Sequence, residues 1–283
     1  MDPEDTPPAA EAPVLLGVAG APAVVAGSLS PRMFAAAFAA TGIRGFYVPL
    51  AIRERAVRKA LRGIARLGFA GVNVTMPYKA VAAEVAHTRS ELVERTGVAN
   101  TLIVRDTGQL HAEATDGLAV TAALAAAGTE LAGRTVTILG AGGAGTEAAF
   151  ACASGGATGI EVWNRSPERS EALVAALREH FPDLELQVRT DLPIHVAAHV
   201  LVSAIPAAAM PPGARAMLDS GPALVVDFAY RADGTPTPVT RLAEERGTQV
   251  VDGRELLVRQ AAEAFRLWLD REPPMEEMQR AVR

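Results

Sequence analysis

Short apolar runs alternate with longer segments in which apolar positions recur every three to four residues, and this alternation predicts an α/β protein. Before residue 116 the runs that predict strands are Val14–Ala19, Phe46–Leu50, Gly71–Thr75, Leu102–Arg105 and Gln109–Ala112. The last two flank Asp106-Thr107-Gly108, a turn sequence that predicts a hairpin. Helical periodicity occupies Pro31–Thr41 and Arg53–Leu67, and a glycine follows each segment as a stop.

The pattern becomes more regular after Asp116. The strand candidates are Thr135–Leu139, Gly159–Trp163, Val200–Ala204, Ala223–Asp227 and Gln249–Val251. The helix candidates are Leu118–Ala127, Gly145–Ser154, Glu168–His180 and Pro238–Arg246. Strands and helices that alternate with short links predict a doubly wound parallel sheet. The chain then closes with an apolar-periodic helix at Arg254–Leu269 and a shorter one near Met275–Val282.

These patterns divide the chain into four segments. Residues 1–13 are rich in proline, alanine and acidic residues, which predicts a disordered tail. We expect residues 14–115 to form an α/β domain, residues 116–252 a second domain, and residues 253–283 a pair of C-terminal helices.

Composition narrows the class of protein. Of the 283 residues 49% are hydrophobic, yet no apolar run approaches the roughly 18 residues of a membrane span. The acidic, proline-rich start is unlike a secretory signal, so we expect a soluble cytoplasmic protein. A net charge of −5 gives no basic footprint for nucleic acid. The single cysteine, Cys152, excludes an intramolecular disulfide and a thiolate metal cage.

A glycine-rich segment, Gly140-Ala-Gly142-Gly143-Ala144-Gly145, directly follows a predicted strand and opens a helix. It contains the spacing G-x-G-x-x-G. In this setting the glycines allow positive φ and a close approach of the backbone to a pyrophosphate, and helix N–H groups face the anion. The setting favours a dinucleotide site over a glycine-rich turn without a ligand.

The end of the next predicted strand indicates which dinucleotide binds. An NAD site places Asp or Glu there to hold the ribose hydroxyls. This chain has Asn164-Arg165-Ser166, with Arg169 one turn further on. Two arginines without an acid suit a ribose 2′-phosphate, which favours NADP over NAD. The alternative is a helix N-terminus that carries only surface arginines, in a chain rich in arginine.

Lys79 and Asp116 are candidates for proton transfer. Lys79 is one of only two lysines, with Lys59, and arginine cannot replace a lysine that must release a proton. An ammonium can protonate the oxygen of a ketone as a hydride adds to its carbon. Exchange near neutrality requires burial to lower the lysine pKa from about 10.4. Spacing alone favours the plainer alternative of a solvated Lys79 and an N-cap Asp116.

Motifs in a fixed order support the chemical interpretation. The longest is Gly71-Val-Asn73-Val-Thr75-Met-Pro77-Tyr-Lys79. The shorter ones are Ser28-Leu-Ser30-Pro31, Val98-Ala-Asn100-Thr101, Thr115-Asp116-Gly117, Gly140–Ala144, Asn164-Arg165-Ser166, Tyr230 with Thr235-Pro236, and Asp252–Ala261. Together they resemble the signatures of shikimate dehydrogenases, among them G-x-N-V-T-x-P-x-K, from about Val14 to the C-terminus.

The resemblance implies a two-domain enzyme that reversibly reduces 3-dehydroshikimate to shikimate with NADP. The C-terminal helices would join residues 14–115 in the substrate domain, and residues 116–252 would form the NADP-binding Rossmann domain. Lys79 and Asp116 become the implied acid/base pair. The implied substrate-binding residues are Ser28, Ser30, Thr75, Asn100, Tyr230 and Gln260. The expected cofactor-binding residues are Gly140, Gly142, Gly143, Ala144, Asn164, Arg165, Ser166 and Arg169.

The chain departs from the family pattern at several places. Segment 20–31 is two residues longer and has no histidine before Ser28, and Ala114 replaces an asparagine. At the nicotinamide end Ser203-Ala204-Ile205-Pro206 replaces N-A-T-S, and Glu255 replaces a glycine. These departures leave two alternatives open. One is a paralogue acting on quinate, aminoshikimate or a related hydroxy-cyclohexane carboxylate, and the other is a non-catalytic NADP-binding regulator.

The expected partners are few. The resemblance implies a small-molecule substrate and a monomer or homodimer, and the composition predicts neither nucleic-acid nor membrane partners. We expect no metal site, since His195 and His199 have no third ligand at a suitable spacing. Cys152 is expected to be a small core residue.

Overall fold

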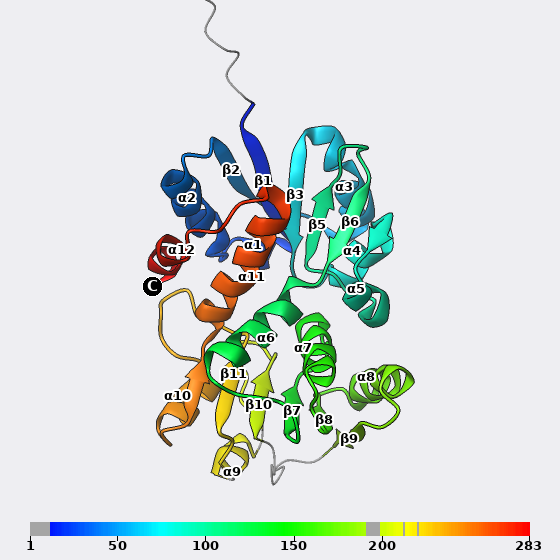
Figure 1. Cartoon of the computed structure of the whole chain (residues 1–283), viewed down its shortest axis with the longest axis vertical. Coiled ribbons are helices and arrows are strands. Elements are labelled where there is room, and N and C mark those ends of the chain that lie inside the picture. Colours follow the sequence, from blue (N-terminus) through cyan, green and yellow to red (C-terminus); the bar gives the residue numbers. More distant parts are fainter. Residues whose placement is uncertain (1–11, 191–198, 212, 220) are drawn as a thin grey trace, which may run out of the picture.

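The computed structural model describes residues 12–190, 199–211, 213–219 and 221–283, and two six-stranded sheets organise them (Figure 1). Each sheet forms the centre of one lobe, and the long helix near the C-terminus runs alongside both. Nearly all of the tail expected at residues 1–13 lies outside the described residues.

The first sheet is mixed. In chain order its strands are β1 (Val14–Gly20), β2 (Gly45–Ala51), β3 (Phe69–Val74), β4 (Thr88–Arg89), β5 (Thr101–Val104) and β6 (Leu110–Glu113). They lie in the order β2-β1-β3-β5-β6-β4, with β1 parallel to β2 and β3. The antiparallel pair β5 and β6 confirms the predicted hairpin. Its helices are α1 (Pro22–Val25), α2 (Ser30–Thr41), α3 (Val57–Gly63), α4 (Lys79–Val85) and α5 (Glu91–Thr96).

The second sheet is parallel throughout, which confirms the doubly wound prediction. Its strands are β7 (Thr135–Leu139), β8 (Gly159–Trp163), β9 (Glu185–Arg189), β10 (Val200–Ser203), β11 (Leu224–Asp227) and β12 (Gln249–Val251). Their order is β12-β11-β10-β7-β8-β9, so the winding reverses between β7 and β10. Open sheets of this kind bind ligands at the carboxyl ends of the strands beside such a reversal. Its helices are α6 (Thr115–Ala126), α7 (Gly143–Ser154), α8 (Pro167–His180), α9 (Ala214–Asp219) and α10 (Pro238–Glu244).

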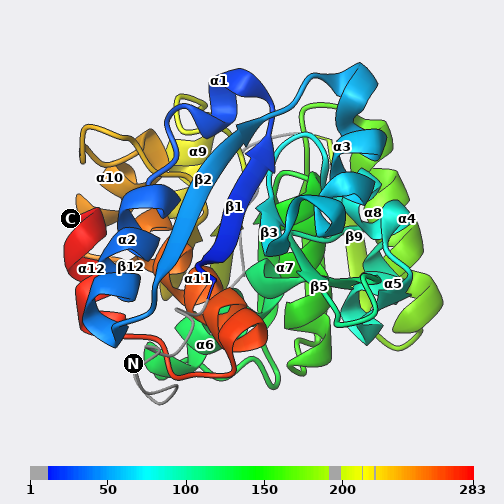
Figure 2. The same ribbon diagram turned by 90° about the horizontal axis from the view of Figure 1, so that it is seen from above.

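The chain returns to the first sheet after β12. Helix α11 (Gly253–Leu269) packs beside α6 and reaches β3, and α12 (Met275–Val282) packs against α2. Figure 2 shows α11 and α12 close to β1 and α2. Phe265 of α11 lies 6.4 Å from Phe34 of α2, ring centre to ring centre, and Trp268 donates its indole N–H to Leu102 O at 3.0 Å. The expected return of the C-terminal helices is therefore confirmed.

Local differences from the sequence predictions have physical causes. The helix predicted over 53–67 is broken into α3 and two short 3₁₀ turns. Gly63 has a low helix propensity, and the Ile64 N–H donates to Leu61 O, three residues back, as in a 3₁₀ turn. Helix α6 begins at Thr115, three residues earlier than predicted. The side-chain oxygen of Asn100 accepts the Thr115 N–H at 2.7 Å and so satisfies a donor that has no partner within the helix.

Several short elements were not predicted from the sequence. They are α1, α5, α9 and the strands β4 and β9. Edge strand β9 places Leu186 and Val188 against the core of the second sheet, while the residues between them are polar. Residues 184–189 alternate strictly between apolar and polar, which is the period-two pattern of a half-buried strand, so the signal for β9 was present in the sequence.

Candidate functional site

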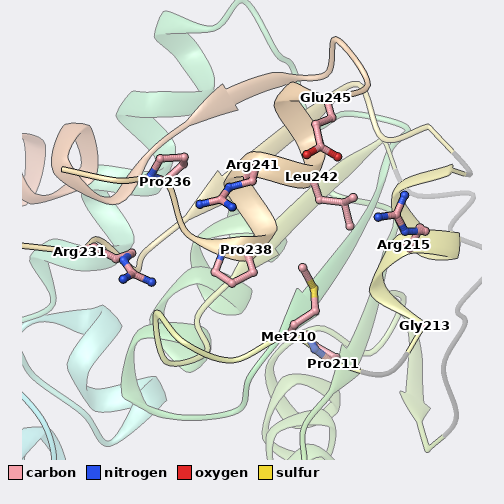
Figure 3. Close-up of a pocket in the computed structure, with 10 residues that line it drawn as sticks. All are labelled: Met210, Pro211, Gly213, Arg215, Arg231, Pro236, Pro238, Arg241, Leu242 and Glu245. Carbon is pink, nitrogen blue, oxygen red and sulfur yellow. The ribbon is translucent and has the colours of Figure 1, made fainter. Parts of the chain in front are cut away.

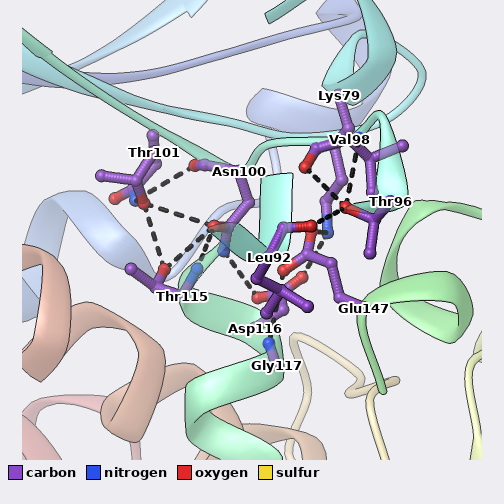
Figure 4. Close-up of polar contacts among 11 residues, drawn as sticks. Lys79, Leu92, Thr96, Val98, Asn100, Thr101, Thr115, Asp116, Gly117 and Glu147 are labelled. Atoms are coloured by element: carbon purple, nitrogen blue, oxygen red, sulfur yellow. Dashed lines mark hydrogen bonds and ion pairs between the residues drawn. The ribbon is translucent and has the colours of Figure 1, made fainter. Parts of the chain in front are cut away.

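Three helix N-termini meet beside the end of β3 and bring charged side chains together (Figure 4). Lys79 is the first residue of α4, Asp116 the second residue of α6, and Glu147 lies in the second turn of α7. The Lys79 ammonium pairs with Asp116 Oδ2 and lies 3.1 Å from Glu147 Oε1. Lys79 is 8% exposed and Glu147 is fully buried. The solvated Lys79 favoured by spacing alone is therefore wrong, because the chain folds its ammonium between two carboxylates.

Asn100 fixes the orientation of Asp116. Its side-chain N–H donates to Asp116 Oδ1 at 2.8 Å, which leaves Asp116 Oδ2 for the lysine. The other end of the amide accepts from Thr115, from the backbone at 2.7 Å and from the hydroxyl at 3.0 Å. Because both ends of this buried amide are occupied, it holds the first turn of α6 and the aspartate in one arrangement.

Polar contacts continue from this cluster across the first sheet. Thr115 and Thr101 share a hydrogen bond of 3.0 Å between their hydroxyls, and Asn73 donates to Thr101 Oγ1 at 3.0 Å. Tyr47 donates to Asn73 Oδ1 at 2.7 Å and lies within hydrogen-bonding reach of Ser30. Burial raises the pKa of Tyr47 above its usual range, so this hydroxyl stays protonated and remains a donor.

The other expected substrate residues lie at the far end of this network or apart from it. Tyr230, on the loop after β11, reaches the side chain of Ser28, and burial raises its pKa. Thr75 is half-buried with its methyl group toward Gly20, and Gln260 donates to Leu257 O within its own helix. The structure therefore links Ser28 with Tyr230 and Ser30 with the Asn100 network, and shows no such link for Thr75 or Gln260 among the described residues.

The pKa of Lys79 moves in the direction opposite to the sequence expectation. Burial acts to lower this pKa, but the carboxylates of Asp116 and Glu147 outweigh burial and raise it above the usual range. Sequence reasoning considered burial and Asp116 and did not include Glu147. Lys79 is consequently an ammonium throughout the neutral range, which is the form that donates a proton.

The glycine-rich loop has the shape that a pyrophosphate requires. Gly140 has φ of 101°, and a Cβ on Gly145 would lie 1.8 Å from Gly140 O, so the loop turns sharply onto the start of α7. Gly142 is the N-cap of α7 with no side-chain cap, and a Cβ there would meet nothing within 4 Å. Open space in front of uncapped helix N–H groups fits an anion. The loop fits NADP on this ground.

Two further contacts tie this loop to its surroundings. Asn164 accepts the Ala141 N–H at 3.1 Å and donates to Ser166 O at 3.0 Å, so it braces the loop against the end of β8. A Cβ on Gly143 would lie 2.7 Å from Lys79 Cδ. The glycine-rich loop and the cluster of Lys79, Asp116 and Glu147 are therefore neighbours.

Arg165 and Arg169 stand exposed beside the bracing asparagine, and Ala144 lies in the first turn of α7. Neither arginine has an ion-pair partner among the residues that the structure describes. Unpaired guanidinium groups are available to a phosphate, with which they form bidentate hydrogen bonds.

A separate pocket of about 470 Å³ opens over α10 and the loop before α9 (Figure 3). Arg215, Arg231 and Arg241 are among its lining residues, with Glu245 on the same rim. Lys79, Asp116 and Glu147 do not line it. This pocket is therefore distinct from the cluster that these three residues form.

Sequence reasoning missed three residues of the site. Asn73 stands in the longest motif but was given no role there. Tyr47 is an isolated polar residue in an apolar run, which is the signal that could have found it. Glu147 lies on the buried face of a helix of small residues, where an acid is unusual. That single charged position was a visible sign of a buried partner.

The described residues also bear on the expectations for a metal site, for Cys152 and for a membrane-spanning helix. Within the described residues no group of His, Cys, Asp and Glu is arranged to hold a metal ion. His195 lies outside the described residues, so its pairing with His199 is not tested. Cys152 is fully buried in the core of the second sheet, as expected. No described helix combines the length and the apolar character that a membrane crossing needs.

Family models match three successive parts of the chain. Residues 18–102 match the shikimate dehydrogenase substrate binding domain, and residues 122–230 match shikimate / quinate 5-dehydrogenase. Residues 253–283 match the shikimate 5′-dehydrogenase C-terminal domain. The matched ranges follow the two sheets and the returning helices described above.

Individual proteins resemble the chain along nearly its whole length. The shikimate dehydrogenase (NADP(+)) of Rubrobacter xylanophilus is 34% identical over 278 residues, which cover 95% of each chain. That of Archaeoglobus fulgidus is 36% identical, with 94% of this chain and 97% of the relative covered. The solved shikimate 5-dehydrogenase of Thermus thermophilus, in complex with NADP(H) and shikimate, superimposes with a TM-score of 0.77 at 33% identity, covering 95% of this chain and 98% of the other.

Proposed function

The chain belongs to the shikimate dehydrogenase family, and on that premise we propose that it reversibly reduces 3-dehydroshikimate to shikimate with NADPH, using Lys79 and Asp116 for proton transfer. The observation that carries the assignment is the buried pairing of Lys79 with Asp116 beside the glycine-rich loop. The two motifs lie far apart in sequence, and only the fold brings them together.

Each residue has a separate role in this proposal. Bound NADPH supplies the hydride. Lys79 donates a proton to the ketone oxygen in reduction and accepts it from the alcohol in oxidation. Asp116, held by Asn100, orients the ammonium and stabilises its charge. The amide and hydroxyl groups of the network would bind the ring hydroxyls, because a substrate hydroxyl left unpaired on burial costs about 1–3 kcal/mol.

The two ends of the substrate would meet different parts of the site. Ser28, Ser30 and Tyr230 form a hydroxyl cluster suited to a carboxylate, and Asn100 lies with the acid/base pair. We assign Thr75 and Gln260 to the same substrate as proposals that rest on the family motifs. In this scheme residues 14–115 and 253–283 bind substrate, and residues 116–252 bind NADP. We also propose that the enzyme acts in the cytoplasm as a monomer or homodimer.

The function is tested by steady-state turnover with shikimate or quinate, each combined with NADP or NAD, while reduced nicotinamide is followed by its absorbance. Turnover predominantly with shikimate and NADP supports the proposal. Preference for quinate would identify the paralogue instead. Binding of NADP without turnover on either substrate would contradict the assignment and indicate a regulator.

The arginines at the end of β8 give a test of cofactor choice. We expect Arg165→Ala to raise the KM for NADP by about tenfold or more, since a charge-assisted bond is worth about 1.5–3 kcal/mol, and to change the KM for NAD little. Arg178→Ala, which removes an exposed arginine in the last turn of α8, is the matched control. Equal losses for both dinucleotides would show that Arg165 does not contact the 2′-phosphate.

A further inference from the structure

Glu147 is a buried acid for which the reaction described so far has no use. It is fully buried on α7, yet it contacts two other elements. Oε1 lies 3.1 Å from Lys79 Nζ of α4, and Oε2 accepts the Gly117 N–H of α6 at 3.3 Å. Glu147 thus reaches the lysine from a direction different from that of Asp116. A side chain placed only to fill space would not be an acid.

The charges of the cluster do not balance. Two carboxylates, Asp116 and Glu147, surround one ammonium, and these are the ionisable groups that act on Glu147 from the described elements around it. A net negative charge in a buried site is unfavourable, and the cluster removes it by binding one more proton. Each carboxylate has a second donor, Asn100 for Asp116 and the Gly117 N–H for Glu147. Asp116 is the more exposed of the two, so the extra proton belongs to the fully buried Glu147.

The titration of Glu147 agrees with its position. Burial raises the pKa of Glu147 to about 8, against the opposing effect of Lys79, and the nearby charge of Asp116 raises it further. Glu147 therefore changes its protonation state in the neutral to mildly alkaline range, while Lys79 remains an ammonium there.

We propose that Glu147 is the proton store of the active site and exchanges a proton with Lys79 between turnovers. In reduction, Lys79 gives a proton to the substrate oxygen and becomes an amine. The Glu147 O–H bond then breaks, the amine lone pair forms a new N–H bond, and the carboxylate that remains takes up a proton from solvent before the next turnover. In oxidation, the Glu147 carboxylate first takes a proton from the ammonium, and the resulting amine accepts the proton of the alcohol. The Glu147 carboxyl then releases its proton to solvent before the next turnover. Glu147 acts through Lys79 and does not touch the substrate, and the inference rests on the proposed function.

The test is the pH profile of turnover for shikimate oxidation with NADP. In the wild type kcat should rise as pH passes through about 8, because the carboxylate form of Glu147 accepts the proton. In Glu147→Gln we expect this rise to be absent and kcat to fall by about tenfold or more, with the KM for shikimate within about twofold. Glu147→Asp retains a carboxylate and should restore a rise at a shifted pH.

The matched control is Glu168→Gln, which removes an exposed acid of α8 and should leave the profile unchanged. An unaltered inflection in Glu147→Gln would overturn the proposal. If that variant does not fold, Glu147→Asp decides the question, since an inflection that does not move excludes Glu147 as its source.

Thermal stability supplies a readout that does not depend on turnover. The pKa of Glu147 is higher in the folded chain than in the unfolded chain, so this group makes the wild type less stable as pH rises toward about 8. The Tm of Glu147→Gln minus that of the wild type should therefore increase as pH rises from about 5 to 8. A constant difference would overturn the proposal. If the Tm difference increases with pH as expected but neither the wild type nor any variant turns over, the proposed function is contradicted. The protonation of Glu147 would still be supported.

Discussion

Replacing Lys79 with alanine is expected to lower kcat about 10²–10⁴-fold, because the ketone oxygen loses its proton donor as negative charge develops on it. NADP binding should change little, since the open space at Gly142 and the arginines after β8 remain. Turnover is measured by absorbance and NADP binding by calorimetry. Lys79 is held by Asp116 and by the fully buried Glu147, so its loss removes the ammonium that both carboxylates contact.

Lys59→Ala is the control for this experiment, because the only other lysine is exposed on α3. It should retain wild-type turnover. In Lys79→Ala the carboxylates of Asp116 and Glu147 lose their counter-charge, so this variant should become less stable as pH rises and they ionise. Its folding should therefore also be checked at low pH, where the carboxyls are protonated. Normal turnover in Lys79→Ala would contradict the assigned role.

The glycine-rich loop offers two substitutions with different expected results. In Gly145→Ala the new methyl group meets Gly140 O at 1.8 Å, so the loop must change shape, and we expect both a lower Tm and loss of NADP binding. In Gly142→Ala the methyl group meets no atom within 4 Å, and φ is −89°, which alanine adopts freely. The fold should tolerate that change.

Gly142→Ala is therefore the more informative variant, because it tests NADP binding without disturbing the fold. We expect an unchanged Tm together with an affinity for NADP reduced about tenfold or more, since the methyl group occupies the space where the backbone approaches the pyrophosphate. Calorimetric titration measures the affinity and a thermal melt measures the Tm. Unchanged affinity would show that the pyrophosphate does not approach the loop at this residue.

Local patterns in the sequence predicted the second sheet well. Strands β7 and β8 are short segments rich in β-branched and other apolar residues, and both were predicted at the bounds observed. The edge strand β9 was missed although its residues alternate between apolar and polar, and the break in the helix at 53–67 was missed although Gly63 lies within it. The early start of α6 depends on a residue distant in sequence, since Asn100 satisfies its first donor.

The site could be predicted only in part for the same reason. Motifs identified Lys79, Asp116 and Asn100, and the structure joins them by hydrogen bonds and an ion pair. No motif contained Glu147, which together with Asp116 raises the pKa of Lys79 against the lowering effect of burial. The strength of an electrostatic interaction depends on distances and burial, and a sequence gives neither of these.

The return of α11 and α12 to the first sheet affects the order in which the protein is completed during synthesis. A ribosome releases the strands and helices of the first sheet early, but Phe265 and Trp268, which pack near Phe34, emerge only at the end. Every strand of the second sheet precedes these helices in the chain. The second sheet can therefore form on the ribosome, while the half of the molecule that is synthesised first becomes complete only after α11 and α12 have been synthesised.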